Sequence, residues 1–251
     1  EIKYKDHYND EYFTGKKTYK DGEGVTRTYH GPSLTWGGFN YIANSLASLL
    51  PKGTLLDVGS SAGDLAARLM KKGFDCYGVE ISEYAIKNCV PEMKGRIALA
   101  DITETPVQLQ GSEGLTFPEQ FDTVIACDLL EHVFEIDLDK TFDWMLSKTR
   151  QNLFFCVATS QPVGSCFREP NKYEFVHKKG EPVPLEWEAT AVSGHVNVRG
   201  YYNFWVPFFK KKGLIIDWMS TYAFQARREL IPAWKNTAGW SMLNTVFLNK
   251  E

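Results

Sequence analysis

Several features that would indicate other classes of protein are absent from this 251-residue sequence. It has no Cys-x-x-Cys pair, so we expect no cysteine metal site. No apolar run reaches the length of a membrane span, and no signal peptide is recognisable. The formal net charge is −3, whereas a duplex-binding surface usually makes a domain basic. We therefore expect a protein that acts on neither nucleic acid nor membranes.

The five cysteines are scattered and odd in number, which favours a reducing compartment over a disulfide framework. Three of them fall in predicted strands, where a buried thiol is ordinary packing. The sequence has no internal repeat, and its length suits one α/β domain with insertions. We expect a cytoplasmic protein, with a homodimer left open. The cysteines are Cys76, Cys89, Cys127, Cys156 and Cys166.

A β-α-β unit is the first structural feature that the sequence predicts. Thr54–Val58 is a short apolar run, as expected of a buried strand. Residues 62–72 have helical periodicity, and Gly73 is a good C-terminal stop. Asp75–Glu80 completes the unit as a second strand, so we expect a right-handed crossover.

The turn between the first strand and the helix is bracketed by Gly59 and Gly63. Glycine allows positive φ and lets a ligand approach the main chain. The turn does not match the G-x-G-x-x-G pattern of dinucleotide sites. Asp57 before the turn and Asp64 after it would repel a pyrophosphate and suit a cation. An ordinary turn with incidental glycines is the alternative for this turn taken alone.

Glu80 ends the second strand, about 17 residues after Gly63. An acid at that place can accept hydrogen bonds from both hydroxyls of a ribose. The turn together with this acid therefore predicts a nucleoside site at the open end of a parallel sheet.

These residues resemble motifs I and II of class I S-adenosylmethionine (SAM)-dependent methyltransferases. The usual pattern is acid-x-Gly-x-Gly-x-Gly. Asp57, Gly59 and Gly63 fit it, and Ser61 stands where the middle glycine often is. The resemblance implies that SAM is the cofactor and S-adenosylhomocysteine (SAH) the product.

The resemblance continues downstream of the turn. Asp101 and Ile102 follow a predicted strand, where the family places an acid on the adenine amino group and an apolar residue on the ring. The run Asp-Leu-Leu-Glu-His-Val from Asp128 is similar to motif IV of small-molecule methyltransferases. The resemblance implies these cofactor-binding residues: Asp57, Gly59, Ser60, Gly63, Glu80, Ile81, Asp101, Ile102, Asp128 and Leu129.

The fold class expected is α/β, a doubly wound seven-stranded Rossmann-like sheet. The resemblance implies the strand order 3-2-1-4-5-7-6 with the seventh strand antiparallel. Besides the β-α-β unit we predict helices over residues 137–150 and 201–212. The remaining strands are predicted over residues 96–100, 121–127, 152–158, 214–219 and 242–248.

Three stretches lie outside the predicted sheet. Residues 1–36 are rich in tyrosine and resemble a lid over the site, although packing on the sheet edge explains them as well. Residues 161–200 leave the carboxyl end of a strand, where ligands of open sheets sit, and should wall the acceptor pocket. Residues 221–240 form the third stretch, so the methyltransferase domain is expected over 37–251 with two insertions.

The charged residues in these insertions can each be interpreted in two ways. The basic cluster of the first insertion could hold an anionic substrate, but a solvated loop is the commoner explanation. Arg227 and Arg228 could face the pocket or lie on a surface helix. The basic cluster consists of Arg168, Lys172, His177, Lys178 and Lys179.

His132 and His195 are the candidates for a catalytic base, because the unperturbed pKa of histidine lies near neutrality. The stretch from Gly194 to Gly213 resembles the ubiquinone-biosynthesis O-methyltransferase group. Glu131 lacks a complementary acid cluster, so we predict no metal. The base-methylation and arginine-methylation motifs are absent, which leaves a small-molecule acceptor, most often methylated at oxygen (a sugar, a phenol, a natural-product intermediate or a carboxylate).

Other functions stay open at this point. An N- or C-methyl acceptor is compatible with the same motifs. A binding module that keeps the fold without turnover, and a nicotinamide-dependent reductase, are the competing classes. The intact turn, Glu80 and Asp101 argue against the binding module, and the turn sequence disfavours the reductase.

Overall fold

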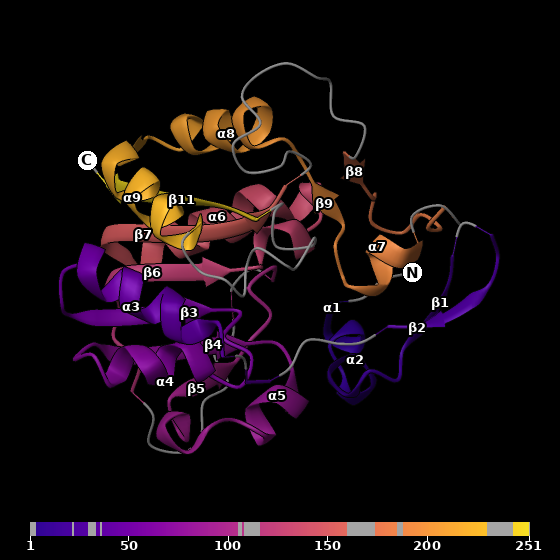
Figure 1. Cartoon of the computed structure of the whole chain (residues 1–251), viewed down its shortest axis with the longest axis horizontal. Helices are drawn as coiled ribbons and strands as arrows, with labels where there is room; N and C mark the ends of the chain where they lie inside the picture. The colour runs from indigo at the N-terminus through magenta and orange to yellow at the C-terminus, as the bar shows by residue number, and fades with distance from the viewer. Residues whose placement is uncertain are drawn as a thin grey trace.

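The structure is a computed structural model that describes residues 4–21, 23–29, 34–35, 37–104, 107, 116–159, 174–184, 188–229 and 243–250. Within these ranges it contains one seven-stranded sheet with the order β10-β11-β7-β6-β3-β4-β5 (Figure 1). The central strands pair in parallel, and β11 runs antiparallel to both of its neighbours. The expected strand order and the expected antiparallel strand are therefore confirmed.

The strands of this sheet lie close to their predicted positions. They are β3 (Thr54–Val58), β4 (Asp75–Glu80), β5 (Ile97–Leu99), β6 (Phe121–Cys127), β7 (Thr149–Ala158), β10 (Leu214–Ile216) and β11 (Leu243–Lys250). Two short pairs lie outside the sheet: β1 (Thr18–Lys20) with β2 (Thr26–Thr28), and β8 (Phe175–Val176) with β9 (Asn197–Val198).

The helices begin with α1 (Tyr4–His7) and α2 (Asp10–Thr14) in the N-terminal segment. The sheet is flanked by α3 (Phe39–Leu49), α4 (Asp64–Met70), α5 (Glu83–Lys87), α6 (Glu135–Lys148), α8 (Val206–Lys211) and α9 (Trp218–Glu229). The structure also contains helix α7 (Glu188–Val192), two short 3₁₀ turns, Pro91–Met93 and Leu130–His132, and a π-helical turn, Tyr201–Trp205. No helix of the described residues is both long and apolar enough to cross a membrane.

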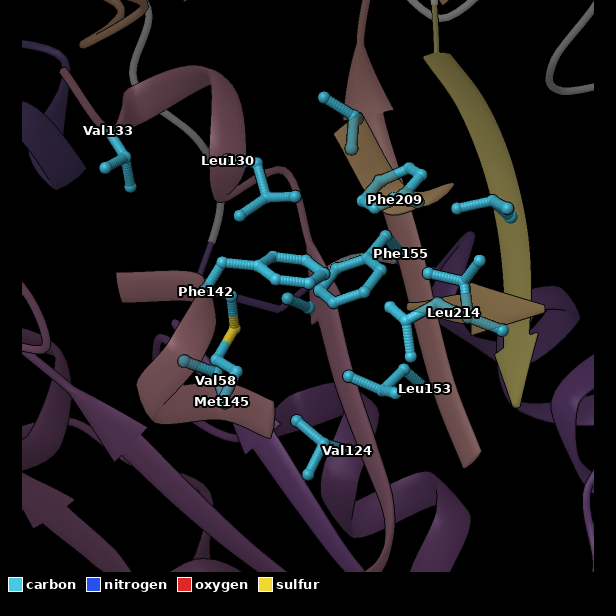
Figure 2. Close-up of a cluster of buried hydrophobic side chains, with 14 of the residues drawn as sticks. Val58, Val124, Leu130, Val133, Phe142, Met145, Leu153, Phe155, Phe209 and Leu214 are labelled. Carbon is cyan, nitrogen blue, oxygen red and sulfur yellow. The ribbon is translucent and has the colours of Figure 1, made fainter. Parts of the chain in front are cut away.

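Apolar side chains alternate along the central strands and so fill a core on each face of the sheet. Phe155 of β7 packs with Phe142 of α6 and Phe209 of α8 on one face (Figure 2). Its neighbour Phe154 packs with Phe224 of α9 on the other face, where α3 and α4 also contribute. Burial on both faces explains why the central strands read as continuous apolar runs.

Three predicted boundaries are wrong. The strand predicted over 214–219 ends at Ile216, because the Asp217 carboxylate accepts a 2.9 Å hydrogen bond from the Ser220 N–H and starts α9 at Trp218 as an N-cap does. The helix predicted over 137–150 spans Glu135–Lys148, and Thr149 already belongs to β7. The helix predicted over 201–212 opens with a π-helical turn, Tyr201–Trp205, before α8.

The N-terminal segment, residues 4–21 and 23–29, lies beside the end of the sheet toward which the parallel strands point (Figure 1). The Tyr12 hydroxyl donates a hydrogen bond to the Ser193 carbonyl oxygen at 3.1 Å. The Lys20 N–H donates to the Glu188 carboxylate of α7 at 2.7 Å. These contacts join the N-terminal segment to α7 and to the loop that follows it.

Candidate functional site

A cavity of about 300 Å³ lies at the carboxyl ends of β3, β4, β5 and β6, roofed by the N-terminal segment. This is the edge at which open α/β sheets bind ligands. Its walls contain acids and aromatic side chains but neither lysine nor arginine, as far as the described residues show. The acids are Asp57, Asp64, Glu80, Asp101 and Asp128, and the aromatics are Tyr4, Tyr8, Tyr12, Phe13, Tyr29 and Phe39.

The turn after β3 needs both of its glycines. Gly59 and Gly63 have φ of +74° and +77°, in the left-handed region that favours glycine. A Cβ on Gly59 would lie 3.0 Å from Leu129, and one on Gly63 would lie 2.6 Å from Met93. Gly59 therefore shapes the cavity wall directly, whereas Gly63 packs behind it and does not line the cavity.

Ser61 and Asp128 are the non-glycine residues with positive φ among those described, at 50° and 52°. Both line the cavity. Backbone strain of this kind persists only where the surrounding structure holds it, and it clusters at functional sites. The two strained positions therefore mark the cavity independently of its shape.

Glu80 is buried at the end of β4 and ties the turn to the strand. Its Oε2 accepts a hydrogen bond from the Ser61 N–H at 2.7 Å, and its Oε1 accepts from Ile81 and Ser82 at 2.9 Å each. Burial raises the pKa of the carboxyl, and these backbone donors act in the opposite direction. A carboxylate has about four lone-pair sites, so the three bonds leave Oε2 free to accept from one more donor.

Asp57, at the penultimate position of β3, is buried and lines the cavity floor. Burial, and then the nearby Glu80 carboxyl, raise the pKa of Asp57 to about 8. The side chain therefore holds a proton at neutral pH until a cation enters. A cationic ligand would shift this carboxyl toward its ionised form.

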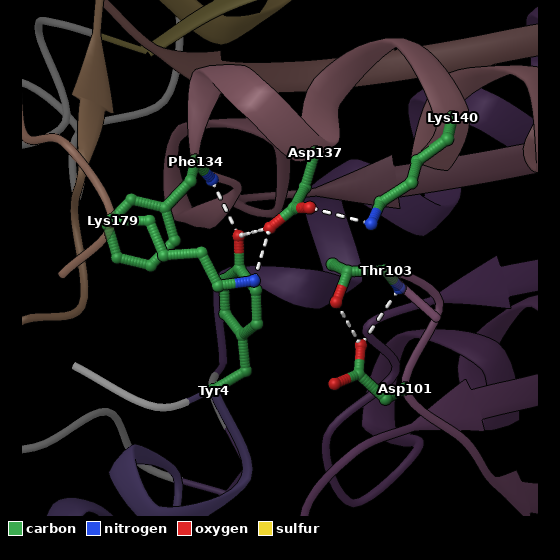
Figure 3. A network of polar contacts seen from close by, with 7 residues as sticks. All are labelled: Tyr4, Asp101, Thr103, Phe134, Asp137, Lys140 and Lys179. Atoms are coloured by element: carbon green, nitrogen blue, oxygen red, sulfur yellow. Dashed lines mark hydrogen bonds and ion pairs between the residues drawn. The ribbon is translucent and has the colours of Figure 1, made fainter. Parts of the chain in front are cut away.

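Asp101, Ile102 and Thr103 form the wall after β5. The Asp101 Oδ1 accepts from both the Thr103 N–H at 2.8 Å and the Thr103 hydroxyl at 2.6 Å (Figure 3). Its Oδ2 takes part in neither bond and can accept from a ligand. Ile102 is buried and, with Ile81, adds an apolar surface for a ring.

His132 and His195 lie together at the cavity wall, with ring centroids 4.7 Å apart. The 3₁₀ turn after β6 carries His132, and the loop before β9 carries His195. Burial lowers the pKa of His132 well below its ordinary value, and burial lowers that of His195 to about 4. Both imidazoles are therefore neutral at pH 7.

Glu131 holds the two loops in place. Its Oε1 accepts from the Ala158 N–H at 2.8 Å, and its backbone carbonyl accepts from Val196 at 2.8 Å. Burial, and then Asp128, raise the pKa of the Glu131 carboxyl. Ligand atoms of Glu131, His132 and His195 lie within 4.8 Å of one another, so among the described residues this is the group that could reach one metal ion. The absence of a metal stays a prediction.

The basic cluster is not gathered at the cavity in the described residues. Lys178 pairs with Glu181 at 3.7 Å, and Lys179 pairs with Asp137 at 2.9 Å. His177 is buried between Phe134 and Phe175. Arg168 and Lys172, and the side chains of Arg227 and Arg228, lie outside the described residues.

The sequence did not single out several residues that line the cavity, among them Tyr8, Thr103 and Ser193. The density of tyrosines in residues 1–36 was the available signal for Tyr8. Nothing in local pattern could select which tyrosine meets His132, because the two are 124 positions apart.

Fold and site together define a methyltransferase with the class I, SAM-dependent fold. Residues 39–199, more than half of the chain, match the family described as "Methyltransferase domain". The chain belongs to this family. It is also 26% identical over 164 residues to YqeM of Bacillus subtilis (strain 168), to which a methyltransferase activity is ascribed. That match covers 64% of this chain and 63% of the relative's length.

Solved structures share the fold at low sequence identity. A SAM-dependent methyltransferase from Clostridium acetobutylicum ATCC 824 has a TM-score of 0.52 at 14% identity, covering 84% of this chain and 90% of its own. The methyltransferase CcbJ from Streptomyces caelestis has a TM-score of 0.53 at 14% identity, covering 87% and 92%. The glycopeptide N-methyltransferase MtfA, solved with SAM, has a TM-score of 0.52 at 13% identity, covering 84% and 87%.

Proposed function

We propose that this protein transfers a methyl group from SAM to a hydroxyl oxygen of a small-molecule acceptor, such as a sugar, a phenol or a natural-product intermediate. The observation that carries the proposal is the acidic lining of the cavity. Its walls hold five acids and two neutral histidines, and the described residues add no lysine or arginine to them. Asp64 pairs with Arg68 at 2.9 Å, and Asp57 is protonated in the free protein and can ionise when a cation binds. SAM is a cation at its sulfonium, so an acidic site favours it.

The donor half of the cavity fits this cofactor. Glu80 would accept from the ribose, and Asp101 with Ile102 and Ile81 would hold the adenine. Asp57, Gly59, Ser60, Asp128 and Leu129 would surround the methionine end. The buried Ser60 Oγ has no hydrogen-bond partner in the structure, which supports a ligand donor or acceptor at this place. Gly63 would act through the shape of the turn.

When bound, SAM supplies a methyl group on a positively charged sulfur for in-line displacement. The chain's own task is alignment, with the acceptor atom held about 3 Å from the methyl carbon. The N-terminal segment would act as a lid that excludes water from this point. His132 or His195 would accept the proton that a hydroxyl acceptor loses, because both rings are neutral at pH 7 and a neutral imidazole carries one lone pair.

An anionic acceptor is disfavoured by the same charge argument, because Lys178 and Lys179 face acids elsewhere. An amine or carbon acceptor remains the second candidate, and a SAM-binding module without turnover the third. The structural likeness to MtfA does not choose between oxygen and nitrogen, since at 13% identity it shows the fold alone.

Calorimetric titration with SAM and SAH tests the donor. We expect micromolar binding of both, a marked loss with Glu80→Ala, and no NADH binding in a parallel fluorescence titration. If neither nucleoside binds and Glu80→Ala changes nothing, the proposal is refuted. An SAH-release assay over panels of hydroxylated and amino compounds then tests the acceptor, and binding without release on any panel favours the module.

A further inference from the structure

Tyr8 of the N-terminal segment reaches directly into the proposed reaction centre. Its hydroxyl oxygen lies 2.9 Å from Nδ1 of His132, at hydrogen-bond distance. The two rings meet edge-on, with centroids 5.8 Å apart. Tyr8 precedes the residues that match the methyltransferase family, which begin at 39, so the family assignment gives this residue no role.

Gly194 closes the same point from a third direction. Its φ is +86°, and a Cβ built on it would lie 2.5 Å from the Tyr8 hydroxyl oxygen and 2.8 Å from His132 Nδ1. The nearby Gly194 backbone acts to raise the pKa of His132, against the larger lowering by burial. Nδ1 is thus the ring nitrogen that faces both Tyr8 and Gly194.

A neutral histidine carries one N–H and one lone pair, and the partner of one nitrogen decides which nitrogen has the proton. Burial keeps His132 neutral, and burial likewise keeps the Tyr8 phenol protonated by raising its pKa. The phenol oxygen can accept from an Nδ1–H or donate to an Nδ1 lone pair. Because Tyr8 and Gly194 both crowd Nδ1, Nε2 is the nitrogen left for an acceptor. Nε2 can take a proton only when Nδ1 carries the proton of the neutral ring.

We propose that Tyr8 and the Gly194 backbone fix His132 in the Nδ1–H tautomer, so that Nε2 is the nitrogen available to the acceptor. Tyr8 is then a positioning residue. The inference rests on the proposed function for the identity of the proton donor. In that step the acceptor O–H bond breaks and its proton bonds to Nε2. The oxygen lone pair forms the bond to the methyl carbon, and the carbon–sulfur pair returns to sulfur.

This arrangement couples the base to the N-terminal segment. Because Tyr8 is carried by that segment, His132 has its full set of Nδ1 partners only when the segment lies over the cavity. Opening the segment would remove one partner from Nδ1 and allow the other tautomer. The lid would therefore contribute to the chemistry of the site as well as to the exclusion of water.

Nitrogen-15 NMR of histidine-labelled protein tests the inference without any acceptor. The comparison is between the unaltered protein and Tyr8→Phe, with His132→Gln to assign the signals. The matched control is Tyr12→Phe, because Tyr12 packs edge-on against Tyr8 at 5.1 Å but donates to Ser193. At pH 7 we expect an Nδ1–H tautomer in the unaltered protein, and a shift of about threefold or more toward Nε2–H in Tyr8→Phe.

Two results would overturn the inference: an Nε2–H tautomer in the unaltered protein, or a tautomer ratio that Tyr8→Phe leaves unchanged. Tyr12→Phe should leave the ratio as it is, and an equal change in both variants would assign the effect to the segment as a whole. SAH calorimetry on the same samples separates the two proposals. If the unaltered protein does not bind SAH but has the expected tautomer, the proposed function is contradicted and the inference about the tautomer stands.

Discussion

The Ser61 N–H donates a 2.7 Å hydrogen bond to Oε2 of Glu80, so the turn after β3 and the acid that ends β4 hold each other in place. The same oxygen can accept one more hydrogen bond, and Glu80 lines the cavity. One side chain thus serves the conformation of the glycine turn and the proposed ribose contact. This double role makes Glu80 the most informative position for mutation.

Replacing Glu80 by Gln should weaken SAH binding by roughly 10- to 100-fold. The substitution replaces a charged carboxylate acceptor by a neutral amide, and hydrogen bonds to charged groups contribute about 1.5–3 kcal/mol. Glu92→Gln is the matched control, since Glu92 is exposed, pairs with Lys71 at 2.8 Å and lies outside the cavity wall. Equal SAH affinities for the two variants, measured by calorimetry, would contradict the assignment.

Binding of SAM should release a proton from Asp57. The pKa of this carboxyl is raised to about 8 in the free protein, so at pH 7 it is mostly protonated. A sulfonium nearby lowers the pKa, and up to about one proton leaves. SAH, which lacks the sulfonium, should release less. Calorimetry in two buffers of different ionisation enthalpy measures this release.

The pH dependence supplies the check on Asp57. Above its free-state pKa, at pH 9.5, the carboxyl is already ionised and the release should vanish. Asp57→Asn should abolish it at pH 7. If Asp57→Asn still releases a proton on SAM binding at pH 7 and at pH 9.5, the released proton comes from another group.

Gly194→Ala should destabilise the protein more than Gly213→Ala. Both glycines have positive φ, +86° and +75°, so each substitution incurs the left-handed penalty of about 1–2 kcal/mol. Only the Gly194 site also brings the new methyl against Tyr8 and His132, since nothing lies within 4 Å at Gly213. Overpacking of this kind adds about 1–3 kcal/mol. Urea unfolding of both variants should show this difference, and equal losses would argue against the close approach.

Tyr4→Phe should loosen the N-terminal segment. The Tyr4 hydroxyl accepts from the buried Phe134 N–H at 2.7 Å and donates to Asp137 at 3.2 Å (Figure 3). Removing it leaves a buried N–H without its partner, which costs about 1–3 kcal/mol. Hydrogen exchange of the Phe134 amide should accelerate, whereas Tyr41→Phe, at an exposed tyrosine, should change nothing. Unaltered protection of the Phe134 amide would show that the Tyr4 hydroxyl is not needed to hold the N-terminal segment in place.

Treatment with a chelator should leave SAH affinity unchanged. Metal ligands must be deprotonated, and burial, followed by Asp128, raises the pKa of Glu131 and so disfavours its ionised form. The Ala158 N–H also occupies one oxygen of Glu131. Binding of Mn²⁺ that is lost in Glu131→Gln, or SAH affinity restored by a metal after EDTA, would contradict the prediction that no metal is held.

The sequence by itself determined the β-α-β unit, the glycine turn and Glu80. Each depends on residues a few positions apart, or on a strand that is apolar on both faces. The ends of the later strands and helices were predicted less accurately. The Asp217 cap, for example, starts α9 two residues after β10, where hydrophobicity alone continued the strand.

Only the tertiary structure decided how the site is completed. Periodicity shows which side chains share one element, but not which distant elements meet. Tyr8, His132 and Gly194 come from three separate segments and converge on one nitrogen atom. The neutral state of both histidines likewise follows from their burial, a property of the packed molecule that no local pattern contains.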